Sequence, residues 1–330
     1  MQPAPLASLA LASLVLLTGS GCRELAIRSA PKKEALAAQD ELSRQAEAAF
    51  WTALHQGRYQ DIPAVTRLLT AAYLQNPNDP KLAAHLGFIH IWKITERQRV
   101  PELDPTVVNH IILARKYFED AVALAPEDAR YLGFLGDAQI SEGKIFNDQR
   151  MQTRGYFTLK QAIRAWPQFN YFTAGYPMSI LPADSKRFAE ALEWQWKTLE
   201  TCAHQPVDRQ NPCLGCETRT GPDRACWNST IAPFNFEGFF LNMGDMLVKQ
   251  GDWKTALTIY GMAKKDKNYS AWPYAYLLED RIRNAQANVR HFNQDPTVFS
   301  AAKPVQQSID PGKVVLFNTG FGCMACHQER

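Results

Sequence analysis

The amino-acid sequence predicts an all-α protein built from antiparallel helix pairs. The first reason is an internal repeat, in which small and large residues recur at fixed helical spacing. The second is composition, because 46% of the 330 residues are hydrophobic and 21% are charged, which suffices for a large buried core. Acidic and basic residues alternate and the net charge is +3, so no nucleic-acid partner is indicated.

The clearest repeat lies between Phe240 and Ala263. Its characteristic positions are Phe240, Met243, Gly244 and Leu247 on a first helix, and Ala256, Tyr260 and Ala263 on a second. The small residues allow two antiparallel helices to approach closely, and the large ones fill the space between them. Gly251-Asp252 supplies the turn. This spacing resembles the tetratricopeptide repeat (TPR), and the resemblance implies a TPR-like α-solenoid with a surface that binds protein partners.

Looser copies of the repeat precede this segment, over residues 57–168. Second-helix positions recur at Val65, Leu69, Ala72 and Pro77, and at Ala114, Phe118, Ala121 and Pro126, while Leu86-Gly87 and Leu135-Gly136 mark first helices. The interval from Gly87 to Ala114 is 27 residues, against 12 from Gly244 to Ala256, so the repeats carry insertions that often mark binding surface. Residues 35–56 are expected to form a capping or spacer helix, and residues 233–292 the last repeat with a C-terminal helix.

The repeat pattern is lost over residues 169–232, apart from a helix expected at Ser185 to Cys202. A loop here contains Cys202, Cys213, Cys216 and Cys226. Two structural disulfides are the first interpretation, because disulfides form in exported chains. A four-thiolate zinc site and a redox-active dithiol at Cys213-x-x-Cys216 are the alternatives. A second haem site is excluded, because Glu217 stands where a histidine would be needed.

The N-terminus has the pattern of an export signal. Residues Pro5 to Leu17 form an apolar run that is too short to span a bilayer, and Thr18-Gly19-Ser20-Gly21 leads to Cys22. This ending resembles the cleavage box of bacterial lipoproteins, although no Lys or Arg precedes Arg23. The resemblance implies a signal peptide over residues 1–22, a lipid on Cys22 that holds the chain to a membrane, and a location on the periplasmic side of a bacterial membrane.

The C-terminal segment, residues 293–330, is expected to be a linker followed by a haem-attachment motif. Cys323-Met324-Ala325-Cys326-His327 has the Cys-x-x-Cys-His spacing of c-type haem sites. Together with Pro311 to Phe317 it resembles the opening helix and haem motif of class I cytochromes c. The resemblance implies one covalent haem c, with thioethers at Cys323 and Cys326 and His327 as the proximal iron ligand.

Only three residues follow His327, so the haem would need a pocket on the helical scaffold or on a partner. Candidates for a second axial ligand are the helical residues His85, His90, His110, His291, Met243, Met246 and Met262. Three alternatives stay open for the tail: a haem with no sixth protein ligand, a disulfide or metal site at Cys323 and Cys326, and the remnant of a truncated cytochrome domain.

Enzymatic motifs give no competing prediction. The sequence has no Gly-rich phosphate loop, no nucleophile elbow and no His-Glu-x-x-His helix. We therefore expect an exported, lipid-anchored, TPR-like protein with one c-type haem that acts in electron transfer or in assembly with partner proteins. The alternative is a non-redox interaction scaffold of the cell envelope, and a third possibility is a haem enzyme with an open sixth position.

Overall fold

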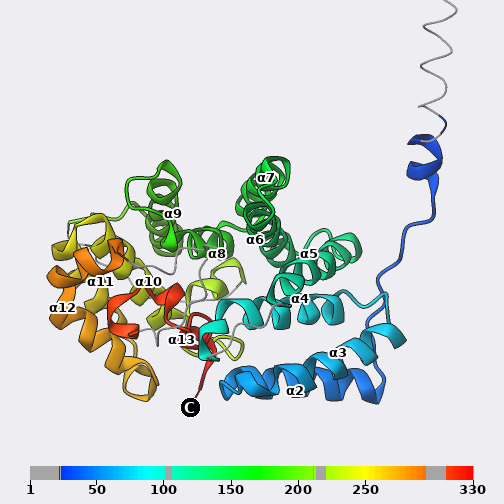
Figure 1. Ribbon diagram of the computed structural model, residues 1–330, viewed down its shortest axis with the longest axis horizontal. Coiled ribbons are helices and arrows are strands. Elements are labelled where there is room, and N and C mark those ends of the chain that lie inside the picture. The colour runs from blue at the N-terminus through cyan, green and yellow to red at the C-terminus, as the bar shows by residue number, and fades with distance from the viewer. Residues whose placement is uncertain are drawn as a thin grey trace, which may run out of the picture. The chain divides into compact units, whose positions relative to one another are not determined.

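The computed structural model describes residues 22, 24–100, 106–210, 212, 221–294 and 310–329. All regular secondary structure in these residues is helical (Figure 1). The chain divides into two compact units, residues 1–34 and residues 35–330. In the first unit, residues 24–29 are helical and Cys22 is an exposed free thiol. The rest of the expected signal peptide, residues 1–21, lies outside the described residues.

The second unit contains twelve α-helices among the described residues. They are α2 (Glu41–His55), α3 (Ile62–Gln75), α4 (Pro80–Thr95), α5 (Val107–Leu124), α6 (Ala129–Ile145), α7 (Gln149–Ala165), α8 (Pro167–Gly175), α9 (Lys186–Ala203), α10 (Asn235–Gln250), α11 (Trp253–Ala263), α12 (Ala275–Asn293) and α13 (Met324–His327). Short 3₁₀ turns are η1 (Tyr59–Asp61), η2 (Arg97–Arg99), η3 (Pro177–Ile180), η4 (Gly221–Cys226), η5 (Tyr269–Ala271), η6 (Pro311–Lys313) and η7 (Leu316–Asn318). Within the described part of the chain, no helix is long and apolar enough to cross a membrane.

Aspartates fix where four of these helices begin. The carboxylates of Asp79, Asp128, Asp148 and Asp252 accept hydrogen bonds from main-chain N–H groups in the first turns of α4, α6, α7 and α11, at 2.7 to 3.1 Å. Each bond satisfies a donor that has no partner within its own helix. Two of these aspartates follow a proline by two residues, so the recurring Pro-x-Asp of the sequence is a helix-start signal.

The repeat predicted from the sequence corresponds to a repeated contact. In three helix pairs the glycine of the first helix lies against a large side chain of the second, so that an added Cβ would be 2.1 to 2.8 Å from it. The pairs are Gly87 with Phe118 (α4–α5), Gly136 with Leu159 (α6–α7) and Gly244 with Tyr260 (α10–α11). Since a Cβ would clash at each position, glycine is what permits the two helices to approach.

Two elements differ from the prediction. The helix expected over residues 35–56 begins at Glu41, because the Asp40 carboxylate caps it by accepting from the Ser43 N–H at 3.0 Å. Residues 35–39 are not helical, and the Ala38 N–H donates to Asp79 at 2.6 Å. The second difference is α8, which the sequence pattern did not indicate. It starts at Pro167, a residue well suited to a first helical turn.

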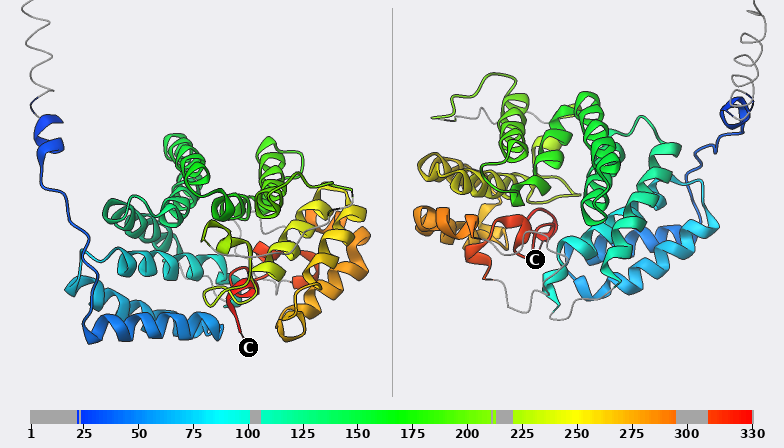
Figure 2. Two further views of the ribbon diagram at one scale, coloured as in Figure 1. Left: turned by 180° about the vertical axis from the view of Figure 1, so that it is seen from behind. Right: turned by 45° about the horizontal axis from the view of Figure 1, so that its top comes forward.

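Successive helices of the second unit pack against one another from α2 to α9, and α10 packs against both α11 and α12 (Figure 1). The C-terminal segment, drawn in red, lies between α2 and α4 on one side and α10 and α12 on the other (Figures 1 and 2). Close contacts of α13 with α2 and α10, and of η6 with α12, agree with this placement. The two ends of the helical array are therefore joined through the last residues of the chain.

Candidate functional site

The haem-motif segment, residues 310–329, is folded into the protein. Val315, Leu316, Met324 and Ala325 are at most 1% exposed. The α-helix implied by the cytochrome resemblance at Pro311 to Phe317 does not form, and two 3₁₀ turns, η6 and η7, stand in its place. The central part of the expected linker, residues 295–309, lies outside the described residues. In the part that follows, Asp310 and Lys313 are exposed, whereas Val314, Val315 and Leu316 are buried against the protein.

A buried ion pair holds the start of this segment. Arg281 on α12 and Asp245 on α10 are both fully buried, and the Arg281 Nε donates to Asp245 Oδ1 at 2.8 Å. The other guanidinium nitrogens donate to the carbonyl oxygens of Gly312 and Val314, at 2.8 and 2.5 Å. Asp245 Oδ2 accepts from the N–H of Leu316 at 2.8 Å. The pair therefore satisfies three main-chain groups of the segment as well as its own charges.

A second buried carboxylate holds the Cys-x-x-Cys-His motif. Glu96, which follows α4, is fully buried, and its Oε1 accepts from the N–H groups of Cys323 and Met324 at 2.8 and 3.0 Å. Its Oε2 accepts from Trp92 Nε1 at 2.8 Å and lies 3.2 Å from Arg99 Nε. Burial raises the pKa of Glu96, while Arg99 and the hydrogen bonds from the motif act in the opposite direction.

Three further side chains donate to carbonyl oxygens of the segment. Tyr176 Oη donates to Gly322 at 2.6 Å, Trp272 Nε1 donates to Ala325 at 2.8 Å, and Arg99 Nε donates to Gly320 at 3.0 Å. These donors are 77 residues or more apart along the chain. Helices from both ends of the array thus fix the main chain of one short segment.

The two motif thiols face the protein interior to different degrees. Cys326 is 6% exposed, and its Sγ lies so close to Gly238 that an added Cβ on the glycine would be 2.3 Å away. Cys323 is half-buried. Burial raises the pKa of the Cys326 thiol to about 12 and that of Cys323 well above its usual value. Neither sulfur is in a disulfide, so both remain thiols in this structure.

His327 is held by one ring nitrogen. Its Nδ1 lies 2.8 Å from the carbonyl oxygen of Ile231, which makes Nδ1–H the donor and leaves Nε2 as the basic nitrogen. Among the described residues Nε2 has no hydrogen-bond partner. Burial lowers the pKa of His327 to about 4, so the neutral imidazole is the form present at pH 7. His55 also contacts the Ile231 carbonyl, with its Nε2 at 3.2 Å.

The donor set of the motif fits a c-type haem in two respects. The imidazole fits, because metal-bound histidines usually donate the second ring N–H to a carbonyl or carboxylate, and His327 does so to Ile231. The two sulfurs are separated by one helical turn on α13, as the motif requires. The contact between Cys326 and Gly238 limits the free space to the remaining sides of that sulfur. The motif residues therefore suit a c-type haem, although Gly238 closes one side of the Cys326 sulfur.

The candidate second axial ligands lie on helices, as expected. Met243, Met246 and Met262 are at most 2% exposed and belong to the core. His85 stacks on Phe50 at 4.5 Å between ring centroids, and His90 and His110 lie with their Nδ1 atoms 2.8 Å apart on α4 and α5. His291 is half-buried near the end of α12. No described contact joins any of these histidines to His327.

The cysteine-rich segment contains a disulfide between Cys202 and Cys226, with the Cα atoms 5.8 Å apart. This confirms a structural disulfide at two of the four predicted positions. It also uses two of the thiols that a four-thiolate zinc site would require, so that arrangement is not present. Cys213 and Cys216 lie outside the described residues, and the prediction of a second disulfide or a redox dithiol falls there.

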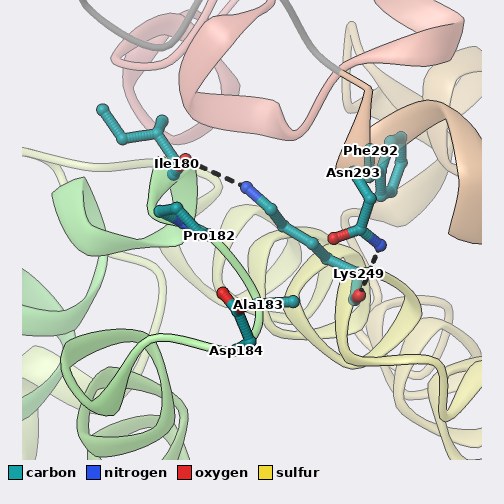
Figure 3. A pocket seen from close by; sticks show the side chains of 7 residues that line it. All are labelled: Ile180, Pro182, Ala183, Asp184, Lys249, Phe292 and Asn293. Atoms are coloured by element: carbon teal, nitrogen blue, oxygen red, sulfur yellow. Dashed lines mark hydrogen bonds between the residues drawn. The ribbon is translucent and has the colours of Figure 1, made fainter.

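A cavity of about 310 Å³ lies beside the ends of α10 and α12, away from the motif (Figure 3). Lys249 lines it, yet the amine donates to the carbonyl oxygens of Ser179 and Ile180 at 3.1 and 3.0 Å. Asn293 closes the group by donating from Nδ2 to the Lys249 carbonyl at 2.8 Å. Lys249 therefore connects the η3 turn to α10 and has a structural role.

Sequence reasoning missed the residues that seat the motif. In the sequence, nothing in the spacing of Glu96, Asp245 and Arg281 distinguishes them from solvent-exposed charged residues. A usable signal existed only for Asp245, which lies between the repeat residues Met243-Gly244 and the apolar run Met246-Leu247-Val248. A charge at such a position needs a buried partner.

Comparison with protein-family models, with curated proteins and with solved structures gives no match to this chain.

Proposed function

We propose that this chain is an exported, lipid-anchored, TPR-like protein that carries one covalently attached c-type haem and acts in electron transfer or in assembly with protein partners. The observation that carries the proposal is the state of His327. Its Nδ1–H is fixed by the Ile231 carbonyl at 2.8 Å, within a Cys-x-x-Cys-His motif whose main chain is held by Glu96. An imidazole fixed in this way presents Nε2 as a ligand.

Five residues would hold and orient the haem. Cys323 and Cys326 would hold the haem through thioether bonds, and His327 Nε2 would bind the iron. When bound, the haem supplies reversible one-electron exchange. The Ile231 carbonyl orients the imidazole, and Glu96 orients the helix that contains it. Because these positions belong to different parts of the array, the haem would sit at a fixed place on the scaffold.

Three further observations support export and the repeat architecture. A disulfide between Cys202 and Cys226 suits an oxidising compartment, which is where covalent haem attachment and lipoprotein anchoring occur in bacteria. The glycine contact that recurs in α4–α5, α6–α7 and α10–α11 supports a solenoid of related helix pairs. The Cys22 thiol is exposed, as a lipid attachment point must be.

A non-redox scaffold is the second candidate, and one observation favours it. Cys326 packs against Gly238 and is 6% exposed, as a cysteine of an ordinary core would be. In this reading the segment serves only to join the two ends of the helical array, and its cysteines remain thiols.

Expression with its leader in a bacterium that has a cytochrome c maturation system decides between the two. We expect a denatured band that retains haem-dependent peroxidase staining and a mass increased by one haem. His327→Ala and Cys326→Ala should abolish or impair the stain, whereas His291→Ala, on the outer end of α12, should not. A colourless protein of unmodified mass would exclude the haem and leave the scaffold.

The anchor has its own test. Cys22→Ala should move the chain from the membrane fraction to the soluble periplasmic fraction, because a lipid on Cys22 is the proposed attachment. If the variant and the wild-type protein fractionate alike, the lipid is not what determines location. Haem staining of the same fractions keeps this result separate from the redox question.

A further inference from the structure

Residues 310–329 are recognised mainly through their main chain. Side chains of the scaffold donate to the carbonyl oxygens of Gly312, Val314, Gly320, Gly322 and Ala325, and accept from the N–H groups of Leu316, Cys323 and Met324. Six scaffold residues make these bonds: Glu96, Arg99, Tyr176, Asp245, Trp272 and Arg281. This is how a groove binds an extended peptide, with main-chain bonds for affinity and buried side chains for register.

Four of those six residues come from distant parts of the helical array. Glu96 and Arg99 follow α4, Asp245 lies on α10, and Arg281 lies on α12. The segment lies between these helices in both views of the molecule (Figures 1 and 2). The N–H of Glu329 adds a bond to the His55 carbonyl on α2 at 2.8 Å. Residues on or next to α2, α4, α10 and α12 therefore surround the segment, and its hydrogen bonds connect these helices to one another.

Apolar side chains anchor the segment at two points. Val315 and Leu316 are buried near Asp245, and Met324 and Ala325 are buried near Glu96. The only covalent connection described between the segment and the scaffold is the main chain through residues 295–309. Neither Cys323 nor Cys326 forms a disulfide with a described residue. All the other attachments of the segment are non-covalent.

We infer that the space between α4 and α10–α12 is a peptide-binding groove whose resident ligand is the chain's own residues 310–329, and that the same segment of a second copy can replace it. The inference goes beyond the proposed function and does not need the haem. It also means that a foreign partner can use this face only by displacing the resident segment.

The test uses the full chain with Cys323→Ser and Cys326→Ser, which prevents both haem attachment and disulfides. A recognition sequence for a site-specific protease is inserted among residues 295–309 and cut in the folded protein. We expect the released segment to co-elute with the scaffold in gel filtration and to be chased out by an excess of a fluorescent peptide of residues 310–330 carrying the same substitutions. Fluorescence anisotropy then gives the affinity of the peptide.

Two matched tyrosine variants test the recognition. Tyr176→Phe removes the donor to the Gly322 carbonyl, so peptide affinity should fall roughly two- to tenfold, the loss expected for one hydrogen bond. Tyr73→Phe removes a bond to Asp120, outside the groove, and should leave affinity unchanged. The inference is wrong if the cut segment dissociates and the peptide does not bind. It is also wrong if cutting abolishes the helical circular dichroism, because the segment would then be an inseparable part of the core.

Discussion

Replacement of Arg281 by lysine tests the account of how the C-terminal segment is held. The guanidinium makes three bonds at once, to Asp245 and to the carbonyl oxygens of Gly312 and Val314. A lysine amine keeps the positive charge for Asp245 but cannot reach three acceptors in this planar arrangement. Two carbonyl groups would lose their donor.

The expected loss follows from those two groups. A buried carbonyl left without a donor costs about 1–3 kcal/mol, so loss of both bonds in Arg281→Lys should lower the free energy of unfolding by about 2–6 kcal/mol. Arg283→Lys is the matched control on the same helix, because its side chain is 69% exposed and meets only Asp280, at 3.4 Å. A surface change of this kind should stay within about 0.5 kcal/mol.

Urea unfolding followed by far-ultraviolet circular dichroism measures both variants. The midpoints convert to free energies through the wild-type dependence on urea, provided that the slope is unchanged. Equal losses in the free energy of unfolding for Arg281→Lys and Arg283→Lys would refute the reasoning, because the buried arginine would then contribute no more to stability than the exposed one. A shift of Arg281→Lys below about 0.5 kcal/mol would refute it as well.

Three further predictions concern stability. Gly238→Ala should lower the thermal midpoint, because its Cβ would lie 2.3 Å from the sulfur of the second motif cysteine, whereas Gly261→Ala, with no atom within 4 Å, should raise it by improving helix propensity. Replacing Cys202 and Cys226 together by alanine should cost about 3–4 kcal/mol in urea unfolding. Burial raises the pKa of Glu237 to about 7, so wild-type stability should fall as pH rises from about 4.5 to about 7. Glu237→Gln lacks this titration, so it should be more stable than the wild type at pH 8 but not at pH 5; the same difference at both pH values would contradict it.

Much of the helical architecture was predictable because it depends on local patterns. The spacing of Gly244 and Tyr260 predicts a close helix pair. Ser185 predicts the start of α9, where its Oγ accepts a hydrogen bond from the Phe188 N–H. The start of α2 was predicted six residues too early, because Ala and Glu favour a helix on either side of the Asp40 cap.

The Cys-x-x-Cys-His motif could be predicted from the sequence, but the residues that hold it in place could not. Cys323, Cys326 and His327 are adjacent in sequence, so their chemistry is evident from spacing alone. Glu96 lies 227 residues from Cys323, and the hydrogen bond between them depends on the path of every helix between. Nothing in a charged residue near the end of a helix indicates such a contact. The expected linker over 293–320 was assigned from prolines and polar residues, yet Val315 and Leu316 within it are buried.

The bond from Met324 to Glu96 spans 228 positions and has a consequence for the order of folding. Closing so long a loop is slow and happens late, since its entropy cost must be met before the contact forms. The hydrogen bond between Met324 and Glu96 is therefore expected to form late in folding, after most helices are in place. A chain stopped before Cys323 would keep most of its helices while leaving the Glu96 carboxylate without two of its donors. In such a product Glu96 would keep only the hydrogen bond from Trp92 and the ion pair with Arg99.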